Sequence, residues 1–237
     1  MSRFGDHFPG STPVVLPVIH VATADQALWN AAIARQAGCA GVFLINHALP
    51  WPGLLAISRR VVAEFPGWWV GGNCLELEPT EVVAQVRPDI SRICADDAGI
   101  DEASTAQPTA ERFFAARQEH QWNGLYLGGV AFKYQREVLE VERAASIAAR
   151  YMDVVTTSGP GTGQAASLAK IAAMKRGLGP APLAIASGIT PENVTAYQPF
   201  ADGLLVATGI SRTFTDLDPQ RVKALQDAVG AGDSPGK

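Results

Sequence analysis

The sequence is short of charge, of cysteine and of long apolar runs, and each shortage excludes a class of protein. Charged residues make up 18% of the 237 residues, below the quarter or so that is usual, and the formal net charge is −4. Because there is no basic tract, we expect neither a nucleic acid nor a membrane surface as a partner. No apolar run approaches the roughly 20 residues that a membrane-spanning helix needs.

The cysteines also exclude some sites. Cys39, Cys74 and Cys94 lie far apart in the sequence and show no metal-ligand spacing such as CxxC. A disulfide framework is unusual in a chain of this length, so we expect a reducing, cytoplasmic compartment. Residues 1–13 contain no apolar segment typical of a signal peptide.

What the sequence does contain is a regular alternation of short apolar runs with longer amphipathic segments. Most of the runs are apolar at consecutive positions, which is typical of parallel strands covered on both faces. The segments between them have helical spacing, and the last one begins with Asp218 as N-cap and Pro219 at the first helical position. The predicted strands are 14–21, 41–47, 68–75, 91–95, 124–131, 153–157, 182–186 and 203–207.

Eight strand–helix units predict a single-domain (β/α)8 TIM barrel. We expect an N-terminal extension over residues 1–12, the barrel over 13–229 and a flexible C-terminal tail over 230–237. The polar stretch 96–109 predicts a long rim loop before the fourth helix. The alternative is an open doubly wound sheet, but the first strand ends in "VIHVATAD", without the GxGxxG turn of dinucleotide-binding folds.

Two successive strands end in a small residue followed by glycine. Ser187 and Gly188 follow the seventh run, and Thr208 and Gly209 follow the eighth. In TIM barrels the site lies at the C-terminal ends of the strands, and these two loops often bind a phosphate. A glycine lets the backbone amides approach an anion, so we expect these four residues to bind phosphate.

The loop after the sixth strand, "TTSGPGTGQAA", fits the same function. Gly161, Thr162 and Gly163 give it amides and a hydroxyl for an anion, although no Walker motif is present. Thr190 and Pro191 predict the start of a helix after the seventh strand, whose N-terminus would add partial positive charge. The alternative is that all these glycines only make tight turns.

Polar residues end the first five predicted strands. The alternation of side chains along a strand places them on the lumen side at the rim, opposite the phosphate loops. Asp96 is a candidate general base, and Lys133 could polarise a carbonyl or form a Schiff base. The alternatives are an ion pair between these two residues and loop-supporting hydrogen bonds by the others. The predicted catalytic set is His20, Asn46, Asn73, Asp96 and Lys133.

No cofactor is predicted. A divalent metal held by His20, Glu76, Asp96 and Asp97 is an alternative without a spacing signature.

Six stretches carry a resemblance to a known family: "AGCAGVFLINH", "VGGNCLE", "GGVAFKYQ", "DVVTTSGPGTGQ", "IASGITPENV" and "DGLLVATGIS". The chain resembles the BtpA/SgcQ family of barrels, which are related in fold to the ribulose-phosphate-binding group. The last two stretches are also similar to phosphoribosylanthranilate isomerase. By position, the resemblance implies functional roles for Asn46, Asn73, Lys133, Thr157, Gly159, Thr162 and Gly163.

The chain departs from the family pattern on the side of strands 2 to 4. Ile45 stands where the family tends to have an acidic residue, and Glu76 and Leu77 stand where it has a basic residue and asparagine. The fourth strand ends in "CADD" instead of an Arg-x-Asn type, and the isomerase's N-terminal catalytic cysteine motif is absent. The resemblance therefore implies a shared fold and phosphate side, with a different reacting side.

Two functions follow from this pattern. The first is an enzyme that acts on a phosphorylated small molecule, such as a ribose-phosphate or nucleotide-like compound, by isomerase, lyase or phosphoribosyl-transfer chemistry. The alternative is a non-catalytic assembly or regulatory barrel with a vestigial phosphate pocket. A homo-oligomer is compatible with either.

Overall fold

The computed structural model describes residues 3–10, 13–85 and 92–232, and its parallel strands close into a barrel in sequence order. The closing pair joins the first strand to the last, with Val14 opposite Gly203. The predicted TIM barrel is confirmed, although Ser91, which we expected to begin the fourth strand, lies outside the described residues. The strands are β1 (Val14–Val21), β2 (Gly41–Asn46), β3 (Trp69–Asn73), β4 (Arg92–Ala95), β5 (Leu125–Gly129), β6 (Val154–Ser158), β7 (Leu183–Ala186) and β8 (Gly203–Val206).

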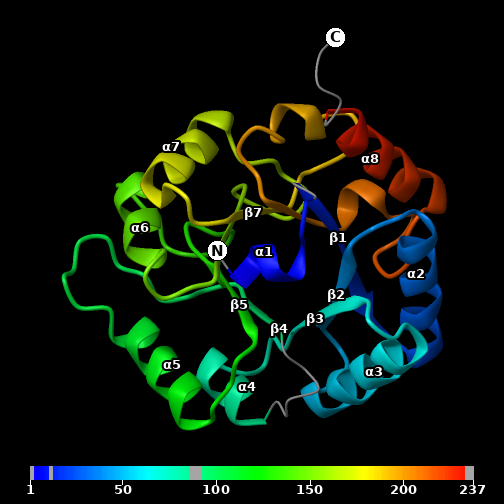
Figure 1. Ribbon diagram of the computed structural model, residues 1–237, viewed down its shortest axis with the longest axis horizontal. Coiled ribbons are helices and arrows are strands. Elements are labelled where there is room, and N and C mark those ends of the chain that lie inside the picture. Colours follow the sequence, from blue (N-terminus) through cyan, green and yellow to red (C-terminus); the bar gives the residue numbers. More distant parts are fainter. Residues whose placement is uncertain (1–2, 11–12, 86–91, 233–237) are drawn as a thin grey trace.

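Helices form a ring outside the strands (Figure 1). The side chain of Asp218 accepts hydrogen bonds from the backbone N–H groups of Gln220 and Arg221, so its predicted capping of the last helix is confirmed. Thr23 caps the first helix of the ring in the same way. The ring consists of α2 (Ala24–Gln36), α3 (Trp51–Glu64), α4 (Pro79–Gln85), α5 (Pro108–Glu119), α6 (Val141–Ala148), α7 (Leu168–Leu178) and α8 (Pro219–Gly232).

The segment after β7 differs from the expected helix. Thr190 and Pro191 begin a turn, followed by the short 3₁₀ helix η1 (Val194–Ala196). The Asn193 side chain accepts a hydrogen bond from the Thr190 amide and donates one to the Gly188 carbonyl. These side-chain bonds compete with the helical pattern, so the loop closes on itself instead of continuing as an α-helix.

The strands bury apolar side chains on both of their faces. One apolar cluster lies between strands and helices, and a second fills the lumen. Phe43 belongs to the lumen cluster and is almost fully buried. A Cβ on Gly71 of the neighbouring strand would overlap the Phe43 ring, so this glycine makes room for a large side chain inside the barrel.

The N-terminal segment closes the opposite end of the lumen from the site. Figure 1 shows α1 (Arg3–His7) lying across the barrel. Phe4 and Phe8 are buried in the lumen cluster, and the Phe8 ring lies 5.4 Å from that of Trp69. The predicted N-terminal extension thus contains a plug for the barrel. Of the predicted tail, residues 230–232 continue α8 and 233–237 lie outside the described residues.

The expected rim loop before α5 is held against the β5–α6 loop. The Glu102 carboxylate is buried and forms an ion pair with Arg136, with one Nη1–Oε1 contact of 3.2 Å. It also accepts the Leu139 amide hydrogen at 3.0 Å. In the part of the chain described here, no helix is long and apolar enough to cross a membrane.

Candidate functional site

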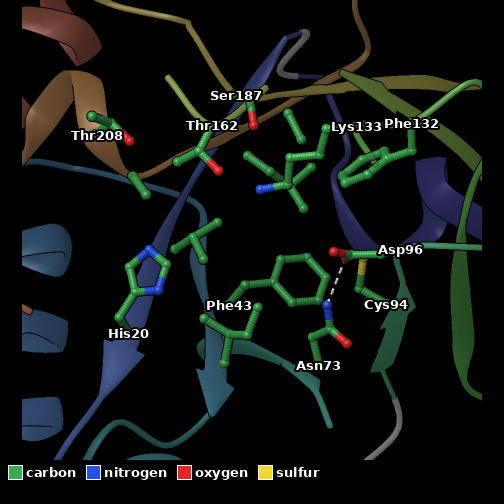
Figure 2. Close-up of a pocket in the computed structure, with 15 residues that line it drawn as sticks. His20, Phe43, Asn73, Cys94, Asp96, Phe132, Lys133, Thr162, Ser187 and Thr208 are labelled. Atoms are coloured by element: carbon green, nitrogen blue, oxygen red, sulfur yellow. Dashed lines mark hydrogen bonds between the residues drawn. The ribbon is translucent and has the colours of Figure 1, made fainter. Parts of the chain in front are cut away.

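A pocket opens at the C-terminal ends of the strands, where the sequence predicts the site (Figure 2). Its cavity volume is about 80 Å³, and it opens to solvent at its mouth. Apolar side chains of the lumen cluster form its floor, and polar side chains come from the C-terminal ends of β1 and β3 and from the loops around it. The lining residues are Val18, His20, Phe43, Ile45, Asn73, Cys94, Asp96, Phe132, Lys133, Thr162, Ala186, Ser187, Leu205, Ala207 and Thr208.

Three hydroxyl side chains lie together on the β6–β8 side of this pocket. Thr162, Ser187 and Thr208 come from three consecutive loops, and Figure 2 shows them along one edge. The backbone N–H groups of Gly163 and Gly188 make no hydrogen bond with the described residues. Hydroxyls and unpaired amides are the groups that bind phosphate oxygens, so the structure brings the predicted anion-binding residues together.

Two glycines of these loops are needed because the loops pack closely against one another. Ser187 and Gly188 both have left-handed backbone angles, with φ of +65° and +70°. A Cβ on Gly188 would overlap the backbone of Ala165, and one on Gly209 would overlap the Ile189 carbonyl. Glycine is therefore required at both positions for the loops to pack, whether or not their amides bind an anion.

The other predicted glycines have looser surroundings. A Cβ on Gly161 would lie 3.2 Å from the side-chain nitrogen Nε2 of Gln164 in the same loop. Gly163 has φ of +73°, and a Cβ there would lie 3.5 Å from the Thr208 side chain. The β6 loop therefore reaches the β8 loop at Gly163, while Gly161 serves the turn itself.

Asp96 and Lys133 reach the pocket from the loops after β4 and β5. The Asn73 side-chain amide donates a hydrogen bond of 2.9 Å to the Asp96 carboxylate, and Figure 2 shows this bond at the pocket wall. Burial raises the pKa of Asp96, although the Lys133 ammonium and the Asn73 hydrogen bond oppose the shift. A carboxyl with a raised pKa is suited to proton transfer.

Lys133 lies beyond the end of β5, in the loop that follows. Its backbone amide donates to the Ser158 hydroxyl at 2.7 Å, and its ammonium lies 5.8 Å from the centre of the Phe132 ring. Figure 2 shows the ammonium projecting into the pocket. Among the described residues no ion pair within 4.0 Å joins Lys133 to Asp96, although the Lys133 charge still acts to lower the pKa of Asp96.

A second lysine, which the sequence did not single out, supports this loop. Lys170 on α7 donates to the Ser158 carbonyl at 2.6 Å and to the Ala131 carbonyl. Burial lowers the pKa of Lys170 to about 8. Because its ammonium is aimed at backbone carbonyls and does not line the pocket, we assign it a structural role that holds the β5 and β6 loops together.

His20 lies on the pocket wall next to two residues that the prediction omitted. Its Nδ1 lies 2.7 Å from Nε2 of His47, and the Phe214 ring packs 4.2 Å from the His20 ring. Burial, His47 and Lys133 together lower the pKa of His20 to about 4. The pKa of His47 is lowered as well, by burial and by Lys133, although Asp96 raises it.

The prediction that Asn46 faces the lumen is wrong. Asn46 is fully buried, donates to the Leu49 carbonyl at 2.8 Å and accepts the Leu75 amide hydrogen at 3.0 Å. Phe43 and Ile45 occupy the lumen side of β2, so alternation turns Asn46 towards the helices. All residues of β2 before Asn46 are apolar or glycine, and their pattern alone could not distinguish the two faces.

Two further residues near the site were missed. His47 follows Asn46 and therefore returns to the lumen side, where it meets His20. Phe132 was expected among the helices but lines the pocket, because Ala131 has φ of +49° and the strand alternation ends before it. No sequence signal predicted Phe214, whose position depends on the loop between β8 and α8.

The alternative metal site is not assembled. Glu76 accepts hydrogen bonds from Asn46 and from the Trp51 amide, and Asp97 accepts one from the Gly99 amide. Within residues 3–10, 13–85 and 92–232, no three His, Cys, Asp or Glu side chains are grouped to hold a metal ion.

The remaining candidates are structural. Cys94 lines the pocket, but burial raises the pKa of its thiol well above the ordinary value, so a thiolate nucleophile is disfavoured. Thr157 is buried and donates to the Ala131 carbonyl at 3.2 Å. A Cβ on Gly159 would overlap the backbone of the Gln164–Ala165 turn. Neither residue lines the pocket, so the family resemblance at these two positions concerns the loop.

No model of a known protein family matches the chain, and no curated protein matches its sequence. Solved structures do match its fold. Phosphoribosyl anthranilate isomerase from Thermus thermophilus has a TM-score of 0.64 and 15% identity, over 92% of this chain and 98% of that one. A structure described as native KDPGal has a TM-score of 0.67 and 15% identity, over 94% and 97% of the two chains.

A third solved structure was determined with a phosphorylated compound bound. (S)-3-O-geranylgeranylglyceryl phosphate synthase from Thermoplasma acidophilum, in complex with sn-glycerol-1-phosphate, has a TM-score of 0.67 and 15% identity over 97% of this chain and 98% of that one. At these identities the likeness establishes the fold. The expected likeness in fold to phosphoribosylanthranilate isomerase is confirmed.

Proposed function

We propose that this protein is a phosphate-binding TIM-barrel enzyme that acts on a phosphorylated small molecule of the ribose-phosphate or nucleotide-like kind. The observation that carries the proposal is a single pocket with two chemically different walls. Three hydroxyls line it from the loops after β6, β7 and β8, and a carboxyl group and an ammonium group reach in from the loops after β4 and β5. Such a pocket can hold a phosphate at one end of a ligand and perform chemistry at the other.

The phosphate end would rest on Thr162, Ser187 and Thr208, and the amides of the neighbouring Gly163 and Gly188 make no hydrogen bond with the described residues. These groups are neutral dipoles, so they can stabilise a phosphate at any pH at which the protein is folded. Solved neighbours in fold include enzymes named for phosphoribosyl and glyceryl phosphate compounds, which supports a phosphate ester as the ligand.

At the reacting end, Asp96 would remove a proton next to a carbonyl group, and Lys133 would stabilise the negative charge that forms on the carbonyl oxygen. Asn73 would orient the carboxylate through its hydrogen bond. This arrangement favours isomerase or lyase chemistry. A Schiff base at Lys133 and a phosphoribosyl transfer are the less direct alternatives, since the first needs a neutral amine.

Membership of the BtpA/SgcQ family is part of this proposal and rests on the six sequence stretches that resemble it. One observation favours the second candidate, a non-catalytic barrel with a phosphate pocket. Ile45 lines the pocket where the family tends to have an acidic residue, so an acid that the family could use is missing from this wall.

The test is ligand binding, with a charge placed in the pocket as the perturbation. Inorganic phosphate, ribose 5-phosphate, ribulose 5-phosphate, phosphoribosyl pyrophosphate, AMP and triose phosphates are screened by thermal shift and calorimetry. A ligand at a hundred times its dissociation constant should stabilise the protein by about 2.7 kcal/mol.

Thr208→Glu should abolish the stabilisation, because a carboxylate beside the hydroxyls repels the phosphate. Thr105→Glu adds the same charge to an exposed threonine outside the pocket and should leave it unchanged. If no phosphate compound stabilises the wild type, or if Thr208→Glu has no effect on the one that does, the phosphate site is wrong.

A further inference from the structure

We propose that His20 and His47 form a proton relay between the pocket and bulk solvent, in which His20 exchanges a proton with the bound ligand and His47 exchanges it with water. The inference rests on the proposed function, because it assigns a second proton-transfer group to the same pocket. His20 is therefore a candidate catalytic residue, and His47 is a positioning and relay residue.

The pair spans the wall of the pocket. His20 is the next-to-last residue of β1 and lines the pocket, whereas His47 follows β2 directly and is exposed to solvent. Their facing nitrogens, Nδ1 of His20 and Nε2 of His47, lie 2.7 Å apart, and the rings are stacked with centres 4.9 Å apart. A contact of this length between two ring nitrogens is a hydrogen bond with one shared proton.

This bond links the state of one ring to that of the other. When His47 donates through Nε2–H, Nδ1 of His20 is the acceptor and its Nε2 carries a proton. His20 can then give that Nε2 proton to a ligand oxygen, receive the shared proton on Nδ1, and leave His47 to take a new proton from water on its own Nδ1. One proton passes from water to the ligand, and both rings begin and end neutral.

The surroundings favour neutral rings. Lys133 and burial act against a positive charge on either histidine, while Asp96 acts on His47 in the opposite direction. The Phe214 ring from the β8–α8 loop packs 4.2 Å from the His20 ring and 5.0 Å from the His47 ring, and adds no charge. A single histidine that resists protonation would transfer protons poorly, but a relay avoids accumulating the charged ring.

The relay faces Asp96 across the pocket. Figure 2 shows the His20 ring and the Asp96 carboxylate on opposite sides, with the Phe43 ring between them. Two proton-transfer groups around one ligand suit a reaction that removes a proton from carbon and adds one to oxygen. Asp96 would take the proton from carbon, the electron pair would move to the carbonyl oxygen, and His20 would protonate that oxygen.

The first measurement is made on the free protein and is independent of any ligand. Histidine ¹⁵N NMR, assigned with His20→Phe and His47→Phe, reports the protonation of each ring nitrogen. We expect His20 to stay neutral from pH 8 to about pH 5, since its pKa is lowered to about 4, and His47 to take up a proton only below its ordinary pKa of 6.5. Independent titration of the two rings near pH 6.5 would overturn the relay, whether or not a phosphate compound binds.

The second measurement follows the transfer of protons. Ribulose 5-phosphate in D₂O exchanges the hydrogens next to its carbonyl for deuterium when an enzyme removes and returns them. We expect His47→Phe and His47→Gln both to slow this exchange at least tenfold with little change in the binding of ribulose 5-phosphate. His120→Phe, which replaces an exposed histidine outside the pocket, should exchange at the wild-type rate.

The two His47 variants distinguish a proton-relay role of His47 from a role in which it only positions His20. Glutamine can make a hydrogen bond to His20 but cannot pass a proton, and phenylalanine keeps only the ring. Wild-type exchange in His47→Gln would show that His47 only positions His20, and wild-type exchange in both variants would remove it altogether. If the wild type binds ribulose 5-phosphate but does not exchange its hydrogens, the relay is also overturned. If no phosphate compound binds, the proposed function is refuted, and the NMR result alone decides whether His20 and His47 share a proton.

Discussion

The two halves of the pocket rim use different chemistry on the same barrel. On the β6–β8 half, the pocket is lined by hydroxyls, and no titratable side chain among the lining residues comes from these loops. On the β1–β5 half lie His20, Asp96 and Lys133, and burial shifts the pKa of the first two towards their neutral forms. One half can therefore bind an anion without responding to pH, and the other half is where pH should act.

The halves also differ in what holds them. Close loop-to-loop packing at Gly188 and Gly209 fixes the hydroxyl half. Side-chain hydrogen bonds and ion pairs fix the titratable half, including the Asn73–Asp96 bond and the pair between Glu102 and Arg136. Substitutions should therefore fail in different ways on the two sides, by steric overlap on one and by lost charge interactions on the other.

The largest effect should come from the titratable half. Asp96→Asn keeps the size of the side chain but removes the base, so deuterium exchange into ribulose 5-phosphate should fall by roughly 10²- to 10⁴-fold. Binding of the phosphate compound, measured by calorimetry, should change little because the side chains proposed to hold its phosphate come from the loops after β6, β7 and β8.

The neighbouring Asp97 provides a matched control. It accepts a hydrogen bond from Gly99 within its own loop and does not line the pocket. Asp97→Asn should therefore exchange at the wild-type rate. Equal losses in both variants would mean that the region was disturbed as a whole and that Asp96 has no special role.

A smaller effect, on stability, should come from the hydroxyl half. Gly188→Ala places a Cβ against the Ala165 backbone at φ of +70°, so the loops must move. We expect a cost of roughly 1–2 kcal/mol for the backbone angle and a further 1–3 kcal/mol for the overlap. Urea denaturation gives the loss of stability, and phosphate affinity should fall with it.

Gly67→Ala separates the cost of the backbone angle from the cost of the steric overlap. Gly67 has φ of +77° with no atom within 4 Å of its Cβ position, so it carries only the cost of the backbone angle. Should both variants lose the same stability, loop packing would not be what holds this half of the rim.

The smallest effect should be pH-dependent and should come from Glu102. Hydrogen bonds from Arg136 lower the pKa of Glu102 from 4.5 to about 2. A lowered carboxyl pKa stabilises the fold above the unfolded-state value, and this contribution is lost as pH falls from 4.5 towards 2. Glu102→Gln should cost roughly 1–2 kcal/mol at pH 7, because Arg136 is half exposed and the pair is partly screened.

Urea denaturation at pH 7 and at pH 3 measures this contribution as a difference. The stabilities of wild type and Glu102→Gln should converge as pH falls through the window from 4.5 to 2. Glu64→Gln, an exposed position at the end of α3, should show no such convergence. A constant difference at all pH values would mean that Glu102 supports the rim only by its shape.

The sequence alone determined the barrel and the end of it that carries the site. The period of its apolar runs specifies strands buried on both faces, and small residues with glycine after β7 and β8 mark the loops. These are local properties, because alternation and turn chemistry depend on a few neighbouring residues. Asn73, Asp96 and Ser187 were correctly placed at the pocket on this basis.

Only the tertiary structure decided which face of β2 turns inward. Apolar side chains or glycine occupy every position before Asn46, so the choice depended on the space that Gly71 leaves beside Phe43. That contact turns Asn46 outward and brings His47 to His20. Phe214 likewise reaches the pair because Gln26 and Asn30 of α2 both donate hydrogen bonds to the Thr215 carbonyl and so hold the loop after β8. Packing between residues distant in the chain decides such positions, and no local pattern records it.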